Sequence, residues 1–186
     1  MNIYVLESPA TSKNGVQRIY GGNGTNKSDF RKAPIDVLWM SGFLRKNGFD
    51  NIFHDSNNSR ETFNDLEDHF RSVSPDIVFF STSTCTIYDD VKVADIAKKI
   101  NPNCICIAFG THVMELTNKT LEESPKVDIG IYSNEWELVS LDIVNNYRDL
   151  SKARGIVYRD SLGQLIKTPP HPPLEHYDDL GFPAHD

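Results

Sequence analysis

The sequence predicts an α/β domain in which helices cover both faces of a parallel β-sheet. Short, continuous apolar runs recur up to residue 132, as is typical of strands that are buried on both faces. Segments with apolar residues at helical spacing lie between these runs, so strand and helix alternate. The predicted strands cover residues 1–7, 50–54, 76–81, 104–110 and 127–132.

Each predicted helix follows a strand and has a recognisable beginning or end. The first begins after Pro34 and ends at Gly48, with apolar residues at helical spacing between them. Ser59 is expected to cap the second helix, with Thr62 three positions on, and Pro75 to end it. The remaining helices are expected around residues 91–101, 115–123 and 136–147.

Five strands and five helices in alternation imply a doubly wound, Rossmann-like parallel sheet with right-handed crossovers. We expect the flavodoxin-like strand order 2-1-3-4-5, whose ligands bind at the carboxyl ends of the strands beside the point where the order reverses. The segments expected to surround that crevice are residues 8–32, 55–59, 81–88, 110–114 and 133–135.

The composition changes after this first domain, which we place at residues 1–150. Residues 155–166 have the pattern of a β-hairpin with its turn at Asp160–Gly163. Residues 168–186 are too rich in proline for regular structure. We therefore expect residues 151–186 to form a β-hairpin and a linker toward a further domain.

Charge and cysteine content exclude several classes of protein. Lys and Arg number 19 against 26 Asp and Glu, a net charge of −7, whereas a general nucleic-acid binder needs clustered basic residues. No apolar run approaches the ~20 residues of a membrane span, and the N-terminal run lacks the basic lead of a signal peptide. Three cysteines without an export signal indicate reduced thiols and a cytoplasmic protein.

Neither a metal site nor a catalytic centre can be assembled from the sequence. The two cysteines of residues 104–106 lie in one predicted strand with their side chains on the same side, and no second ligand pair has zinc spacing. His54 and Asp55 at a strand end could form a polar pair or, equally, cap the end of the strand. Residues 21–28 (GGNGTNKS) resemble a phosphate-binding loop, but Asn26 stands where that pattern requires glycine, so we expect a flexible or partner-ordered loop.

Hydroxyl-bearing side chains follow the third predicted strand. They occupy five of the six positions in residues 81–86, where a ligand could reach the backbone and hydroxyls could bind amides or phosphates. Helix capping by Thr86 or its neighbours explains only one or two of them. At the next strand end, Gly110 would let a flat ligand lie close to the chain, whereas a lone loop histidine such as His112 is more often a surface group than a ligand.

Together these segments resemble the N-terminal cobalamin (vitamin B12)-binding domain of cobalamin-dependent radical SAM proteins, a family that includes anaerobic cyclases and methyltransferases. The resemblance covers nearly the whole chain. Its most specific part is the hairpin with the proline-rich tail, residues 155–186. The other matching segments are residues 34–50, 74–113 and 127–137.

The resemblance implies a cobalamin that lies across the strand ends, with its nucleotide tail inserted between the sheet and a helix. Residues 110–112 match the family's Gly-Gly-Pro-His turn, except that Phe109 replaces the first glycine. Residues 132–135 stand where members commonly have Gly-Glu-Gly-Glu. The cofactor-binding residues implied in this way are Ser81, Thr82, Ser83, Thr84, Gly110, Thr111, His112, Ser133, Asn134 and Glu135.

Two motifs of related proteins are absent from this chain. The first is Asp-x-His-x-x-Gly, whose histidine binds cobalt from below in the classical cobalamin fold. Because it is absent, the resemblance implies a cobalt without that histidine ligand. The CxxxCxxC motif is also absent, because no cysteine follows Cys106, and without those thiolates no [4Fe–4S] cluster forms to cleave S-adenosylmethionine. We therefore expect no catalytic residue here, and expect S-adenosylmethionine and the cluster only in a radical SAM domain acting in cis or in trans.

The resulting hypothesis is a cobalamin-binding module of a radical SAM enzyme that performs methyl transfer or related radical chemistry. One alternative is a cofactor-free interaction domain with the same fold, which the altered turns at residues 109–110 and 133–134 and the long segment 8–32 would suit. Another is a flavin or signalling domain. A receiver domain, however, needs an acidic cluster after the first strand, where only Glu7 lies.

Overall fold

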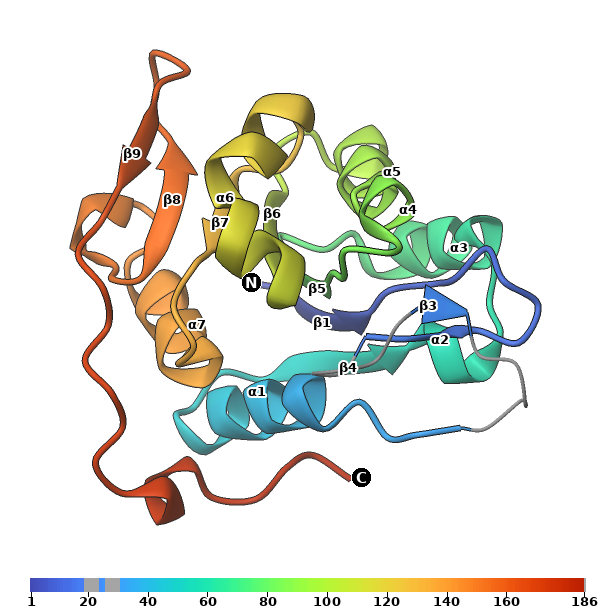
Figure 1. The fold of residues 1–186 in the computed structure, drawn as a ribbon, viewed down its shortest axis with the longest axis horizontal. Helices are drawn as coiled ribbons and strands as arrows, with labels where there is room; N and C mark the ends of the chain where they lie inside the picture. The colour runs from blue at the N-terminus through green and yellow to red at the C-terminus, as the bar shows by residue number, and fades with distance from the viewer. Residues whose placement is uncertain (19–23, 26–30, 186) are drawn as a thin grey trace.

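The central sheet has the strand order that the sequence predicts. The computed structural model describes residues 1–18, 24–25 and 31–185 of the 186-residue chain. Five parallel strands lie in the order 2-1-3-4-5, counted along the chain (Figure 1). In spatial order they are β4 (Asn51–Asp55), β1 (Ile3–Glu7), β5 (Ile77–Ser81), β6 (Ile105–Phe109) and β7 (Ile129–Ile131).

Helices α1 and α7 cover one face of the sheet, and α3, α5 and α6 cover the other (Figure 1). Right-handed crossovers that run in opposite directions along a sheet place their helices on opposite faces, which separates α1 from α3, α5 and α6. The helices are α1 (Ile35–Lys46), α2 (Ser56–Ser59), α3 (Phe63–Val73), α4 (Ile87–Asp90), α5 (Lys92–Ile100), α6 (Thr111–Glu123) and α7 (Trp136–Asn145), with 3-10 turns η1 (Leu150–Lys152) and η2 (Tyr177–Leu180).

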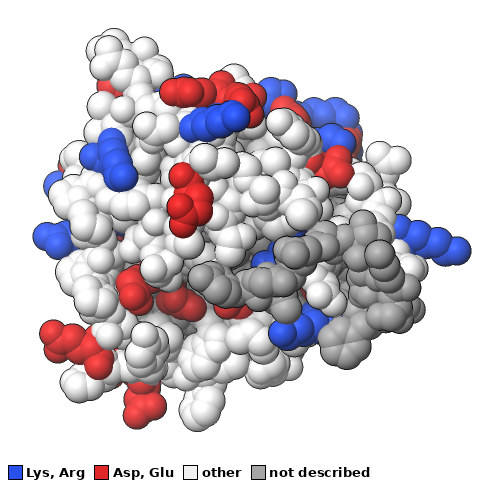
Figure 2. Space-filling view, viewed as in Figure 1, with Lys and Arg blue, Asp and Glu red and all other residues white. Residues whose placement is uncertain are grey.

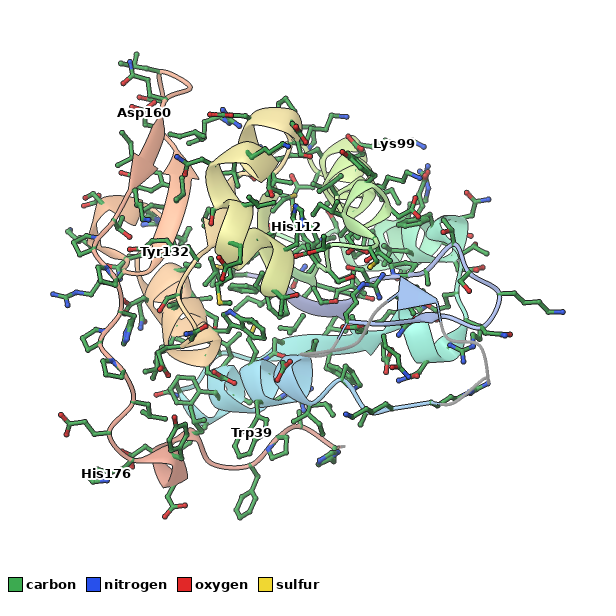
Figure 3. All side chains as sticks on the ribbon, in the orientation of Figure 1. Trp39, Lys99, His112, Tyr132, Asp160 and His176 are labelled. Atoms are coloured by element: carbon green, nitrogen blue, oxygen red, sulfur yellow. The ribbon has the colours of Figure 1, made fainter. Side chains whose placement is uncertain are left out.

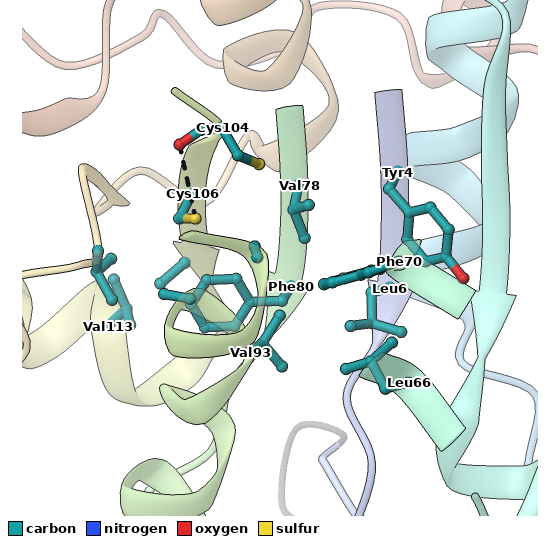
Figure 4. Close-up of a cluster of buried hydrophobic side chains, with 14 of the residues drawn as sticks. Tyr4, Leu6, Leu66, Phe70, Val78, Phe80, Val93, Cys104, Cys106 and Val113 are labelled. Atoms are coloured by element: carbon teal, nitrogen blue, oxygen red, sulfur yellow. Dashed lines mark hydrogen bonds between the residues drawn. The ribbon is translucent and has the colours of Figure 1, made fainter. Parts of the chain in front are cut away.

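Each face of the sheet has its own apolar core, because successive strand residues point to opposite faces. On the face covered by α3, α5 and α6, Leu6, Phe70 and Phe80 pack in one cluster with both Cys104 and Cys106 (Figure 4). The two cysteines share that face as their spacing predicts, and Cys106 Sγ lies 3.9 Å from the carbonyl oxygen of Cys104. On the other face, apolar side chains of α1 and α7 pack on the strands.

The predicted β-hairpin forms and extends the sheet beyond β7. β8 (Ile156–Arg159) pairs antiparallel with β7, and β9 (Leu165–Lys167) pairs antiparallel with β8. In the turn, the Asp160 carboxylate accepts a hydrogen bond from the Gln164 N–H at 2.8 Å. The hairpin is thus part of a seven-stranded sheet, while the division of the chain at residue 150 stays a prediction.

The proline-rich tail is irregular apart from η2, and it runs back along α1 (Figure 1). The Ala184 N–H donates to the carbonyl oxygen of Leu38 at 3.0 Å. Lys46 Nζ donates to the carbonyl oxygen of Asp179 at 2.6 Å. Helix α1 thus provides hydrogen-bond partners for backbone groups of the tail that lie outside the sheet and the α-helices.

Two helix beginnings differ from the sequence prediction. Thr62, not Ser59, caps α3: its hydroxyl accepts a hydrogen bond from the Asp65 N–H, and the Asp65 carboxylate accepts one from the Thr62 N–H. This reciprocal capping box satisfies two N–H groups, whereas Ser59 lies in the short helix α2. Helix α6 begins earlier than expected, because Gly110 (φ +115°) turns the chain directly from β6 into the helix.

Part of the long segment 8–32 forms a two-stranded ribbon that the sequence did not predict. β2 (Val16–Gln17) pairs antiparallel with β3 (Gly24–Thr25). Most of residues 21–28 lie outside the described residues. This is the segment that resembles a phosphate-binding loop and that we expected to be flexible or ordered by a partner.

The surface carries charges of both signs. Lys and Arg side chains lie scattered among Asp and Glu on the face seen in Figure 2. Some of these charges pair, for example Lys99 with Glu67 at 2.7 Å and Lys126 with Asp95 at 3.1 Å. Among the helices in the described ranges, none is long and apolar enough to cross a membrane.

Candidate functional site

A pocket opens at the carboxyl ends of β1, β5 and β6, beside the switch point between β1 and β5. This is the place that the strand order predicts for a ligand. The volume of the cavity is about 40 Å³, which leaves room for only a few water molecules. Its walls include Glu7, Ser81, Thr82 and Gly110 at the strand ends, Val37 of α1 and Trp136 of α7.

Three of the residues implied by the resemblance, Ser81, Thr82 and Gly110, line this pocket. Ser81 Oγ accepts a hydrogen bond from the Ser8 N–H at 3.2 Å, and Thr82 Oγ1 donates to the carbonyl oxygen of Phe109 at 2.7 Å. A Cβ atom on Gly110 would lie 2.3 Å from the Thr82 carbonyl oxygen, so only glycine fits there. The strand ends therefore form a rigid, hydrogen-bonded floor.

Ser83 is buried but belongs to the turn above the pocket. Its N–H donates to the Asp90 carboxylate at 3.0 Å, and its hydroxyl lies 2.8 Å from Thr86 Oγ1. Thr86 Oγ1 in turn donates to Asp90 at 2.7 Å. These contacts order the turn into α4, so at Ser83 a local structural role accounts for the hydroxyl.

Thr84, Thr111 and His112 lie beyond the strand ends and outside the pocket wall. The Thr84 hydroxyl lies 3.3 Å from His112 Nδ1. Figure 3 shows His112 at the beginning of α6, where burial lowers the pKa of the imidazole and keeps it neutral near pH 7. Their predicted role toward the cofactor stays a prediction.

The three implied residues that follow β7 are not brought into the pocket. Ser133 packs against Gly155, where an added Cβ would lie 2.7 Å from the Ser133 Cβ. Asn134 and Glu135 line a separate hollow that also borders the proline-rich tail. The residue of this segment that reaches the pocket is Trp136, which the sequence did not single out.

Trp136 lines the pocket and carries a buried donor that no described residue pairs. Its ring meets Phe109 edge to face, with the ring centroids 5.5 Å apart. Its buried Nε1–H has no hydrogen-bond partner among the described residues. An unsatisfied buried donor costs roughly 1–3 kcal/mol, so a bound group that accepts this hydrogen bond would be stabilised.

The buried cluster of Glu7, Arg18 and Asp90, called the Arg18 cluster below, closes the inner end of the pocket. The Arg18 guanidinium donates to Glu7 at 3.1 Å and to Asp90 at 2.7 Å. It also donates to the carbonyl oxygens of Ser8 and Pro9, both at 2.7 Å. These bonds hold the loop after β1 against the ends of β1 and α4.

Burial and charge act in opposite directions on the Arg18 cluster. Burial alone would lower the pKa of Arg18, but the carboxylates of Asp90 and Glu7 outweigh it and raise that pKa, so the guanidinium stays charged. Burial raises the pKa of Glu7 and of Asp90, while the positive charge of Arg18 opposes it. The sequence offered only two signals for this cluster, Glu7 after the first strand and the unusual length of segment 8–32.

His54 and Asp55 do not form the polar pair considered from the sequence, because consecutive strand residues point to opposite faces. His54 Nε2 lies 2.6 Å from a carboxylate oxygen of Glu61. The Asp55 carboxylate instead accepts a hydrogen bond from the Asn58 N–H at 2.9 Å. With His69, these contacts create a group of metal-ligating side chains that sequence spacing did not reveal; His54, Glu61 and His69 are called the His54 cluster below.

Comparisons with known proteins find relatives and solved structures that this chain resembles. The chain matches no family model. It is 27% identical over its whole length to an uncharacterized methyltransferase of Pyrococcus horikoshii, covering 38% of that protein. It is 29% identical over 78% of its length to the anaerobic magnesium-protoporphyrin IX monomethyl ester cyclase of Rubrivivax gelatinosus, covering 27% of that enzyme.

Solved structures with the same fold include two S-adenosylmethionine radical enzymes. OxsB with aqua-cobalamin and S-adenosylmethionine bound superposes with a TM-score of 0.72 at 15% identity, over 92% of this chain and 22% of OxsB. The methyltransferase TsrM from Kitasatospora setae superposes with a TM-score of 0.67 at 12% identity, over 92% of this chain and 30% of TsrM. The chain resembles part of the cobalamin-dependent radical SAM enzymes.

This confirms the resemblance predicted from the sequence. The chain spans between about a quarter and two fifths of the curated relatives that it matches. Most of each cobalamin-dependent radical SAM enzyme therefore has no counterpart in these 186 residues.

Proposed function

We propose that the chain is a cobalamin-binding module of a radical SAM enzyme. The pocket at the switch point carries this proposal, because its wall holds a buried indole donor, Trp136 Nε1, without a partner among the described residues. The similarity to proteins named as cobalamin-dependent supports the choice of cofactor.

The residues of the pocket fit the nucleotide tail of a cobalamin. Val37, Phe109 and Trp136 offer flat apolar surface to an aromatic base, and the indole N–H can bind an acceptor on it. Gly110 lets the chain turn into α6 while lying close against Thr82 at the floor of the pocket. Lys32 lines the same pocket and can bind the phosphate of the tail.

The walls of the pocket must separate before a tail can enter, because about 40 Å³ is too small for a nucleotide base. The strands are buried on both faces and hydrogen-bonded on both sides, so they are the rigid part. Gln17 and Arg18 line the pocket from the loop after β1, so a tail that enters from this side must break bonds of the Arg18 cluster.

Bound cobalamin would supply the cobalt chemistry of group or radical transfer, and this chain would hold and orient it. A radical SAM domain, in cis or in trans, would supply S-adenosylmethionine and the [4Fe–4S] cluster. Residues 1–150 would then be the cofactor domain and residues 151–186 the connection to the catalytic domain. We place the chemistry in methyl transfer or a related radical reaction.

Binding can be tested by incubating the full chain with hydroxocobalamin, desalting it and recording the visible spectrum. We expect near-stoichiometric corrinoid absorbance. Ser81→Trp should abolish it by filling the pocket, and Trp136→Phe should weaken binding about three- to tenfold because one hydrogen bond is lost. Ser161→Trp, at the exposed hairpin turn, is the matched control and should bind like the parent chain.

A cofactor-free interaction domain is the second candidate, and the small cavity closed by the Arg18 cluster favours it. Its signature in the same experiment is a colourless chain that circular dichroism shows to be folded. Equal corrinoid retention by the parent chain and the Ser81→Trp variant would instead show that the cofactor binds elsewhere.

A further inference from the structure

Three elements bring metal-ligating side chains together at the outer edge of the sheet. His54 comes from β4, Glu61 from the connection between α2 and α3, and His69 from α3. His54 Nε2 lies 2.6 Å from one Glu61 carboxylate oxygen, and His69 Nε2 lies 3.6 Å from the other. One ligand atom from each residue falls within 4.8 Å of the other two.

The spacing of these atoms is close to that of a metal coordination sphere. Zinc binds histidine nitrogen and carboxylate oxygen at about 2.0–2.2 Å, so two ligands of a tetrahedral site lie roughly 3.3–3.5 Å apart. The two distances from Glu61, 2.6 and 3.6 Å, bracket that value. Side-chain rotations that move the ligand atoms by about 1 Å would therefore admit the ion.

The chain holds the Glu61 carboxylate in place from two sides. The Glu61 N–H donates to the carbonyl oxygen of Ser56 at 3.0 Å, and Ser56 Oγ donates to the Glu61 carboxylate at 2.8 Å. Thr62 starts α3 directly afterwards with its capping box. Hydrogen bonds of this kind orient the ligands of metal sites in proteins.

Tyr4 gives an independent sign that a group belongs beside the His54 cluster. Its side chain is 1% exposed, yet its hydroxyl has no hydrogen-bond partner among the described residues. The Tyr4 ring centroid lies 5.7 Å from that of His54, and Figure 4 shows the hydroxyl on the side of β4. A water bound to a metal ion would donate a hydrogen bond to this hydroxyl oxygen.

An ion can reach the cluster from solvent. The His69 side chain is 45% exposed and lines a surface hollow together with Asp65, Asp68 and Ser72. The two aspartates add negative charge at the entrance. An ion held by three protein ligands at this depth keeps positions open for water or a small ligand.

The geometry points to a site for a divalent transition-metal ion, with His54 Nε2, His69 Nε2 and the Glu61 carboxylate as ligands. Two imidazoles with one carboxylate suit zinc, iron and cobalt. The site lies on the face covered by α3, whereas the pocket lies between the strand ends, α1 and α7. It shares no residue with that pocket, so the proposal does not depend on cobalamin binding.

The test uses the purified full chain after treatment with a chelator, with Co²⁺ as an optical probe and Zn²⁺ in calorimetry. We expect one equivalent of Co²⁺ to produce the visible bands of a low-symmetry complex, and Zn²⁺ to displace it. His69→Gln and Glu61→Gln should each weaken binding at least tenfold. His176→Gln is the matched control, because Figure 3 places His176 in the tail, away from the cluster.

Two outcomes would overturn the proposal. One is a folded parent chain that shows no metal-dependent band at millimolar Co²⁺. The other is equal affinity in the parent chain, His69→Gln and Glu61→Gln, which would place the ion at other residues. His69 is partly exposed on α3, so its variant keeps the fold, and circular dichroism verifies this.

Discussion

Two charged clusters lie at neighbouring positions of β1 and β4, and they differ in how completely their polar atoms are paired. The Arg18 cluster is closed to solvent, and each guanidinium nitrogen donates to a carboxylate or a carbonyl oxygen. The His54 cluster is partly open, and the buried Tyr4 hydroxyl beside it has no partner among the described residues.

The difference separates a structural role from a capacity to bind. A charged group that is buried and fully hydrogen-bonded has nothing left for a ligand, and removing one member leaves the others unpaired. A cluster with open positions can accept an ion at small cost. The Arg18 cluster therefore fixes the loop that closes the pocket, whereas the His54 cluster is the candidate for a bound metal.

The largest expected effect is that of Arg18→Met. It leaves Glu7 and Asp90 buried without a cation, and breaking a buried pair in this way costs about 3–5 kcal/mol. Urea denaturation measures the change in the free energy of unfolding. The exposed Arg154→Met is the control and should change that free energy by less than about 0.5 kcal/mol.

The free energy of unfolding of His69→Gln in metal-free buffer tests the same difference between the two clusters. A partly exposed contact between a histidine and a carboxylate contributes at most about 0–1 kcal/mol, so this variant should be nearly as stable as the parent chain. Equal losses of stability in Arg18→Met and His69→Gln would contradict the distinction between the two clusters.

Glu137 is a partly buried carboxylate, and no positive charge in the described part of the chain contributes to its pKa, which makes its expected effect intermediate. Burial raises the pKa of Glu137 to about 7, against 4.5 for the free side chain, so the folded chain binds an extra proton between these pH values. Its stability therefore falls as pH rises from about 4.5 to 7. Glu137→Gln removes this penalty and should raise the free energy of unfolding by about 1–3 kcal/mol at pH 8.

Measuring the effect of Glu137→Gln on stability at a second, lower pH provides the control. At pH 4 the carboxyl group is protonated in both the folded and the unfolded chain, so Glu137→Gln should leave stability unchanged within about 0.5 kcal/mol. The exposed Glu122→Gln should show no comparable gain at pH 8. A gain that is equal at pH 4 and pH 8 would mean that ionisation of Glu137 is not its cause.

Tyr4→Phe on the metal-free chain should have as small an effect as His69→Gln. A hydroxyl without a partner gives up no hydrogen bond, so its removal should be neutral or stabilising by up to about 1 kcal/mol. A loss above about 2 kcal/mol would show that the hydroxyl has a partner, and would remove one argument for the metal site.

The sequence was a good guide to the strands and a partial one to the site. Both-face burial leaves a continuous apolar run, and this locates β1, β5, β6 and β7 without tertiary information. At the strand ends, Ser81, Thr82 and Gly110 were predicted and line the pocket. Ser133, Asn134 and Glu135 were expected at the same crevice from the strand order and the resemblance; Trp136 lines the pocket, whereas Asn134 and Glu135 line a separate hollow, and the role of the three residues toward a cofactor stays a prediction.

By itself, then, the sequence determined the alternation of strands and helices and the resemblance to one family, because apolar periodicity and local turn chemistry act within a few residues. Only the tertiary structure decided which charged side chains meet. Arg18 and Asp90 are 72 positions apart, and no periodic pattern connects a loop residue with a helix residue across that distance. Their pairing arises because parallel strands bring distant loops to one edge of the sheet, whereas His54 meets Glu61 and His69 because the segment that follows β4 folds back onto that strand.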